Sequence, residues 1–66
     1  MALYNVREAA QALRISEVEL RRRLRAREIG HIRIGRRIVL RDQDLSTFCE
    51  ERAVPAGEAG RGRGND

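Results

Sequence analysis

The first part of the chain places apolar residues at the spacing of two short amphipathic helices. The inward face of the first helix is formed by Val6, Ala9, Ala10 and Leu13. Because these positions recur with a period near that of an α-helix, they predict a helix over residues 6–13. Asn5 precedes this segment and Glu8 stands three residues later, a spacing typical of a capping box at a helix start.

A second helix is predicted to begin after Ser16, because Glu19 follows it at the same capping spacing. Leu20 and Leu24 lie four residues apart and form the inward stripe of this helix. Only residues 14–15 separate the two predicted helices, and so short a link is typical of a helix-turn-helix.

Residues 31–40 alternate in the manner of a β-hairpin. Ile32 and Ile34 flank Arg33, so the first strand has one apolar face. Gly35 favours a two-residue turn of type II′. That turn would pair Arg37 with Ile34 and place an arginine on the apolar face.

A three-residue loop instead pairs Ile34 with Ile38 and Ile32 with Leu40. Because register follows the buried face, we expect the three-residue loop, with Arg36 and Arg37 at its tip. The next residues, beginning at residue 42, predict a third helix with acids in its first turn, which complement the helix dipole. Its apolar stripe consists of Leu45, Phe48 and Cys49, and Cys49 is expected to be a small core residue.

These elements predict one domain over residues 1–52, mainly α with a small β-hairpin, in a winged helix-turn-helix arrangement. Residues 53–66 contain Pro55 and four of the six glycines, without periodicity, and are expected to be a disordered tail. Arg61 and Arg63 in that tail are interpreted mainly as solvated charge, with contact to a phosphate backbone or a partner protein as the alternative.

Charge is concentrated in the middle of the chain. Between Arg21 and Arg41 nine arginines stand against one acid, Glu28, so this segment carries +8. The remaining five arginines stand against nine acids and carry −4. A helix and a hairpin tip that are both rich in arginine indicate a surface for binding DNA.

The second helix predicts which side chains face a major groove, because its outward face lies opposite Leu20 and Leu24. Arg22 and Arg25 are the candidates for contacts with base edges, and Arg21 and Glu19 for the groove walls. Val18 is the candidate for contact with a thymine methyl group, and Ser16, at the helix start, for a phosphate. On the hairpin, Arg36 and Arg37 are the candidates for the minor groove or its phosphates, and Arg33 is a further candidate for contact with DNA, with solvated charge as the alternative.

Other functions find little support in the composition. Cys49 and His31 are the only residues of their kinds, so no metal-ligand spacing exists, and we expect no metal or cofactor. A chain of 66 residues has little room for a catalytic pocket, and no enzyme activity is expected. No apolar run suggests a signal peptide or membrane span, so a cytoplasmic location is the default expectation.

Several short motifs in this order resemble the small winged-helix domains of phage excisionases and MerR-type regulators. They are Tyr4-Asn5-Val6, Glu8-Ala9-Ala10, Ile15-Ser16, Leu20, Arg22, Arg33-Ile34-Gly35, and Asp44-Leu45 with Phe48. The resemblance covers roughly residues 3–49. It departs from the family after the second helix, where glycine is usual and this chain has Arg27, and within that helix, where Thr and Tyr are usual and this chain has Glu19 and Arg21.

The resemblance implies a stand-alone excisionase, or recombination directionality factor, acting in a bacterial host cell. Such a protein binds repeated sites in attachment-region DNA, self-associates cooperatively there, bends the duplex and steers a tyrosine integrase toward prophage excision. A small MerR-like transcriptional regulator of phage or prophage genes is the alternative. A basic module that binds RNA or an acidic protein is a third hypothesis, which the placement of the arginines disfavours.

Overall fold

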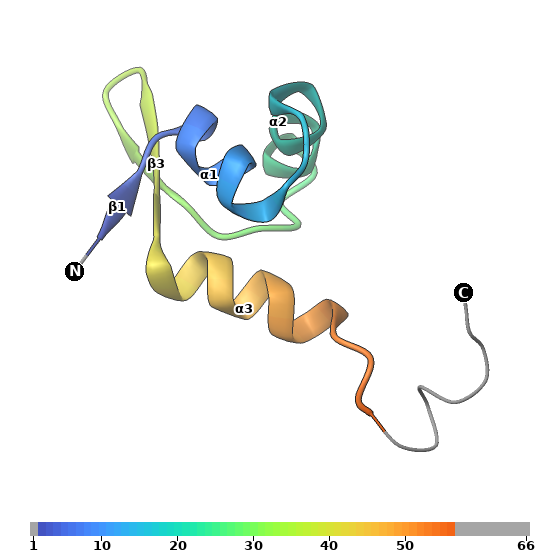
Figure 1. Ribbon diagram of the computed structural model, residues 1–66. Coiled ribbons are helices and arrows are strands. Elements are labelled where there is room, and N and C mark those ends of the chain that lie inside the picture. The colour runs from blue at the N-terminus through green and yellow to red at the C-terminus, as the bar shows by residue number, and fades with distance from the viewer. Residues whose placement is uncertain (1, 57–66) are drawn as a thin grey trace.

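A computed structural model describes residues 2–56 and shows a winged helix-turn-helix, as predicted. In chain order the elements are β1 (Leu3–Tyr4), α1 (Val6–Leu13), α2 (Glu17–Arg25), β2 (Ile32–Ile34), β3 (Arg37–Arg41) and α3 (Asp42–Arg52). The strands form an antiparallel sheet in the order β1-β3-β2. In Figure 1 the hairpin of β2 and β3 rises on the same side as α1 and α2, while α3 leads away from it.

The starts of the first two helices follow from their capping residues. The Asn5 side chain accepts a hydrogen bond from the Glu8 amide at 2.7 Å, and the Glu8 carboxylate accepts one from the Asn5 amide at 3.0 Å. The predicted capping box and the predicted bounds of α1 are therefore confirmed. At α2, Ser16 accepts from the Glu19 amide at 3.0 Å, but the Glu19 side chain turns to arginines instead, so only half of the second box forms.

Each helix of the pair is followed, within two residues of its end, by an arginine in the left-handed backbone conformation. Arg14 has φ 61° and Arg27 has φ 60°. Each end carries the paired hydrogen bonds of a Schellman motif, such as Glu28 amide to Arg23 carbonyl at 2.9 Å and Arg27 amide to Leu24 carbonyl at 3.1 Å. The cap usual for a glycine therefore forms with arginine, at the backbone strain that a Cβ brings in this region.

The hairpin register differs from the expected one. Ile34 pairs with Arg37 and Arg33 pairs with Ile38, so Gly35 and one further residue form a two-residue turn. Gly35 has φ 61°, which suits a turn of this length. The expectation was wrong because the tip of the wing has no core to cover: Ile34 is 56% exposed. Turn chemistry, and not burial, fixes the register there.

This register turns the isoleucine face of the wing away from the core. Ile38 and Leu40 face the core, whereas Ile34 and its neighbour Ile32 share the opposite face with Val39. Leu3 of β1, which is 53% exposed, pairs with Arg41 and so joins the same outer face. The outer face of the sheet therefore carries Leu3, Ile32, Ile34 and Val39, which we call the apolar outer strip, together with Arg37 and Arg41, which pair with Ile34 and Leu3.

The core lies where α1, α2 and α3 meet the inner face of the sheet. Its buried apolar residues are Val6, Ala9, Ala10, Leu20, Leu24, Ile29, Leu40, Leu45 and Phe48. Cys49 is exposed, so the prediction that it belongs to the core was wrong: Leu45 and Phe48 already turn that face of α3 inward, and Cys49 lies beside it. The expected tail begins after α3 ends at Arg52, and residues 57–66, with Arg61 and Arg63, lie outside the described residues.

One buried charge was not predicted. Asp44 is 6% exposed and accepts three hydrogen bonds from Arg41: from the amide at 3.0 Å, Nε at 2.8 Å and Nη2 at 2.7 Å. The Arg41 guanidinium holds the pKa of the Asp44 carboxyl below its usual value. This pair joins the end of β3 to the start of α3 and thereby fixes the wing to the body of the domain.

Candidate nucleic-acid interface

The outward face of α2 is open, as the helical spacing predicted. Val18 is 76% exposed, and the side chain of Arg22 is 71% exposed. Arg25 and Arg21 are exposed on the same helix, opposite the buried Leu20 and Leu24. Among the described residues, Val18 is the most exposed of the large apolar side chains, so it is accessible to a contact from outside the fold.

A basic groove runs between α2 and the wing. It has a volume of about 580 Å³ and is lined by Arg21, Leu24, Arg25, Arg27, His31, Arg33 and Ile38. Four of these seven residues are arginines and none is acidic, so the groove concentrates positive potential between the two elements.

The wing tip lies close to the start of the helical pair. Arg36 and Arg37 line a smaller hollow of about 280 Å³ together with Arg7, Arg21 and one acid, Glu17. Arg21 therefore borders both the basic groove and this hollow. Together these residues form one basic surface, which we call the α2–wing face. It consists of Arg21, Arg22, Arg25, Arg27, Arg33, Arg36 and Arg37.

Glu19 does not point freely from this face. Its carboxylate accepts a hydrogen bond from Arg22 Nη2, and its second oxygen lies 2.9 Å from Arg23 Nε. The hydrogen bond from Arg22 lowers the pKa of the Glu19 carboxyl, and the same bond raises the pKa of Arg22. Glu19 is thus a counter-ion within its own helix.

Two residues of the groove were not predicted as site residues. Arg27 enters it from the left-handed cap after α2, and His31 enters from the loop before β2, with its Nδ1 3.2 Å from the Ile29 carbonyl oxygen. The position of Arg27 directly after a basic helix was the available signal. His31 carried no such signal, since its place depends on the path of the loop between α2 and β2.

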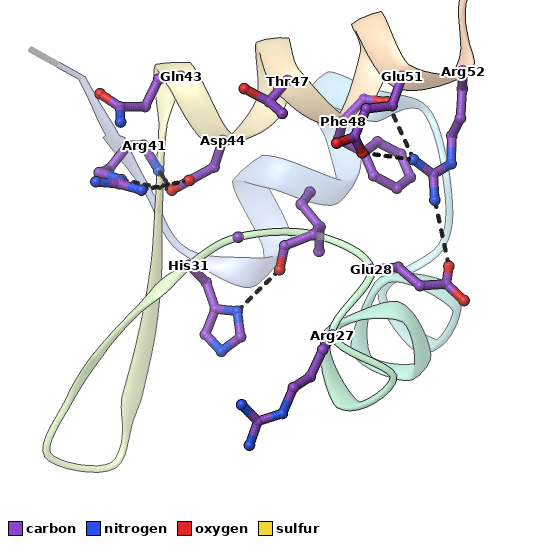
Figure 2. Close-up of a pocket in the computed structure, with 12 residues that line it drawn as sticks. Arg27, Glu28, His31, Arg41, Gln43, Asp44, Thr47, Phe48, Glu51 and Arg52 are labelled. Atoms are coloured by element: carbon purple, nitrogen blue, oxygen red, sulfur yellow. Dashed lines mark hydrogen bonds and ion pairs between the residues drawn. The ribbon is translucent and has the colours of Figure 1, made fainter.

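The groove opens toward α3 into a neighbouring cavity of about 770 Å³, with which it shares Arg27 and His31, and there the charged side chains pair with one another (Figure 2). Arg52 lies over the Phe48 ring at 3.8 Å, and its Nη2 is 3.6 Å from Glu28. In Figure 2 Arg27 and His31 point away from these pairs, toward the wing and α2. The positive potential therefore belongs to the α2–wing end of the groove.

Comparison with known proteins agrees with this geometry. The family model of a helix-turn-helix domain matches residues 3–53, which include every described helix and strand. No curated protein and no solved structure matches the chain significantly. Within residues 2–56, no helix is both long and apolar enough to cross a bilayer.

A helix-turn-helix domain indicates sequence-specific binding of double-stranded DNA, and such domains are typically not enzymes. Here α2 occupies the place of the recognition helix and the β2–β3 hairpin that of the wing. On the match over residues 3–53, the chain belongs to the helix-turn-helix domain family.

Proposed function

We propose that the α2–wing face binds double-stranded DNA, with α2 in the major groove and the wing at the adjacent minor groove. The observation that carries this proposal is the groove between α2 and the wing, lined by four arginines and no acid. Phosphates supply the negative charge that such a groove attracts, and an α-helix fits the width of the major groove.

The side chains divide into two roles by their position. Arg22, Arg25 and Val18 project from the centre of the exposed helix face and make the contacts with base edges. The backbone contacts come from residues at the rim of that face: Ser16, Arg21, Arg33, Arg36 and Arg37, joined by Arg27 and His31. Glu19 also lies at this rim, but it acts through the arginines beside it and not on phosphate.

Two variants separate these roles. Arg22→Ala is expected to weaken binding to a preferred duplex by about 1–3 kcal/mol and binding to random duplex only slightly. Arg36→Ala is expected to weaken both by similar factors. Equal losses on both duplexes for Arg22→Ala would assign that residue to the backbone instead of a base.

We further propose that the protein is an excisionase that binds attachment-site repeats and steers a tyrosine integrase toward excision. Its family, which includes excisionase-like DNA-binding proteins, and the sequence resemblance support this role. A single module of this kind covers roughly 600–1,000 Å² of protein surface, which is little for selective binding by one copy.

Several copies bound side by side would cover more DNA and so bind it more selectively than one copy. The protein is expected to be a monomer in solution that binds adjacent sites cooperatively, through a head-to-tail contact that extends along the DNA. The apolar outer strip, with Leu3 at 53% and Ile34 at 56% exposure, offers a surface for the neighbouring copy. Successive wings inserted in phase would bend the duplex.

Gel-shift measurements on fragments with one, two and three sites test this arrangement. A higher affinity per site on two sites, together with its loss in Leu3→Ser, is the expected result; binding of Leu3→Ser to one site should stay unchanged. A dimer in sedimentation of the free protein, or independent binding to two sites, would contradict it. Binding at a promoter operator without nearby integrase sites would favour a MerR-like regulator.

A further inference from the structure

Glu19 occupies an unusual position for an acid on a recognition helix. Its side chain is 26% exposed, and each carboxylate oxygen lies against an arginine of the same helix, Arg22 on one side and Arg23 on the other. The Arg22 contact is a hydrogen bond, and the Arg23 contact is an ion pair in which Nε makes no hydrogen bond to the described residues. The two arginines thus orient the carboxylate within the helix, and its charge repels phosphate.

The Arg23 side of this arrangement is anchored in the core. Arg23 Nη1 is 2.8 Å from Glu28 Oε1, and the guanidinium carbon lies 5.5 Å from the centre of the Phe48 ring. Phe48 is 8% exposed, and Arg52 covers the same ring and also pairs with Glu28. Figure 2 shows the two partners of Arg23, Phe48 and Glu28, gathered with Arg52 near the end of α3.

A chain of contacts thus runs from the core to the tip of one outward side chain. It passes from Phe48 to Arg23, from Arg23 to Glu19 and from Glu19 to Arg22. Arg22 stands at its outer end, with 71% of its side chain exposed. The contacts of Glu19 restrict where the Arg22 guanidinium lies before any DNA is bound.

We propose that Glu19 is a positioning residue for base recognition, which holds the Arg22 guanidinium ready for a guanine edge. This inference rests on the proposed function of the α2–wing face. It has two consequences of opposite sign: Glu19 increases discrimination between duplexes through Arg22, and its charge decreases affinity for DNA of any sequence.

The size of the first consequence follows from the mobility of arginine. Immobilising one such side chain on binding costs about 0.5–1.5 kcal/mol, which corresponds to about 2- to 12-fold in affinity. A released Arg22 also reaches phosphates on any duplex, so affinity for random DNA rises while the preference falls. If the Glu19–Arg22 ion pair served only to stabilise the helix, its removal would leave the ratio of selected to random affinity unchanged.

The test uses the full chain, a duplex selected by the wild-type protein from a randomised library, and a random duplex of the same length. Glu19→Gln is compared with Glu17→Gln, which removes the same charge from the same helix turn, where Glu17 pairs only loosely with Arg21 at 3.9 Å. Both variants should bind random duplex more tightly. Only Glu19→Gln should lower the ratio of selected to random affinity, by about 2- to 12-fold.

Two further variants separate positioning from charge and from folding. Glu19→Asp keeps the charge but draws the carboxylate back by one methylene, so it should lower the ratio while strengthening binding to random duplex less than Glu19→Gln does. In an Arg22→Ala background, Glu19→Gln should leave the ratio unchanged. Melting curves show which variants are folded at the assay temperature. If Glu19→Gln is unfolded there, the affinity ratio of Glu19→Asp provides the test.

The outcomes distinguish this inference from the proposed function. A wild-type protein that prefers no duplex over random DNA would overturn both. A wild-type protein with a clear preference, retained in Glu19→Gln and Glu19→Asp, would overturn the inference alone. The same loss of ratio with and without Arg22 would also overturn it, because Glu19 would then act by another route.

Discussion

The strength of the salt dependence of DNA binding is set by how many arginines on the α2–wing face lack an internal partner. Of the nine arginines between Arg21 and Arg41, Arg23 and Arg41 are held by acids, and Arg22 is held by Glu19. In the described part of the chain, five have no carboxylate within 4.0 Å: Arg25, Arg27, Arg33, Arg36 and Arg37.

Arg21 adds a sixth available charge, because its pair with Glu17 is long, at 3.9 Å, and exposed. Each neutralised phosphate contributes about −0.9 to the slope of log affinity against log salt concentration. Five or six contacts therefore predict a slope of about −4.5 to −5.4 on random duplex. Counting every arginine of the segment would give about −8, so the slope measures how far the internal pairs withhold charge from DNA.

The assay is a series of fluorescence-anisotropy titrations at increasing salt concentration, with wild type and two charge-matched variants. Arg33→Gln removes a groove arginine and should make the slope shallower by about 0.9. Arg52→Gln removes an arginine that pairs with Glu28 and Glu51 on the far side, and its slope should equal that of the wild type. A slope near zero would refute DNA binding by this face, and equal shifts in both variants would refute the assignment of its residues.

Three further predictions concern the fold that holds this face. Leu24→Ala removes a side chain that is 5% exposed under α2 and should destabilise the domain by about 2–5 kcal/mol; an unchanged melting curve would mean that α2 packs on another face. Asp44→Asn should lower the stability of the domain at neutral pH but not at low pH. Because folding lowers the pKa of Asp44, its carboxylate stabilises the fold above its ordinary pKa of 3.8, and this contribution is lost as the pH falls through the folded-state pKa. Melting temperatures of wild type and variant that differ by the same amount at every pH would contradict the Arg41–Asp44 pairing. Arg27→Gly should raise the melting temperature by relieving the left-handed cap, yet weaken binding to random duplex, and a loss of stability would show that the cap is not strained.

What was predictable from the sequence was local in origin. The capping box of Asn5 and Glu8 and the stripe of Leu20 and Leu24 depend on residues within one or two turns, and the structure contains them as predicted. The pairing of Glu19 with arginines three and four positions later is also local. Spacing alone did not decide whether the Glu19 carboxylate would bond the Ser16 amide in a capping box or contact the two arginines, since both arrangements use the same carboxylate.

What the sequence left open depends on packing between distant segments. The hairpin register rested on the assumption that the isoleucine face is buried, but nothing in the described fold covers the wing tip at Ile34. The burial of Asp44 depends on Arg41 turning back across the strand–helix junction. His31 joins the basic groove because the loop from Ile29 carries it there, and no periodic pattern marks that path.

The two-residue turn at Gly35 constrains how this wing can change in evolution or in the laboratory. Alternate residues of a strand point to opposite faces, so a slip of β2 by one residue against β3 would turn every side chain of β2 to the other face. Arg33 would leave the groove for the apolar outer strip, and Ile32 or Ile34 would take its place. The wing can therefore acquire new target preferences by exchanging side chains at fixed positions, whereas a change in register would replace the basic side of β2 with an apolar one.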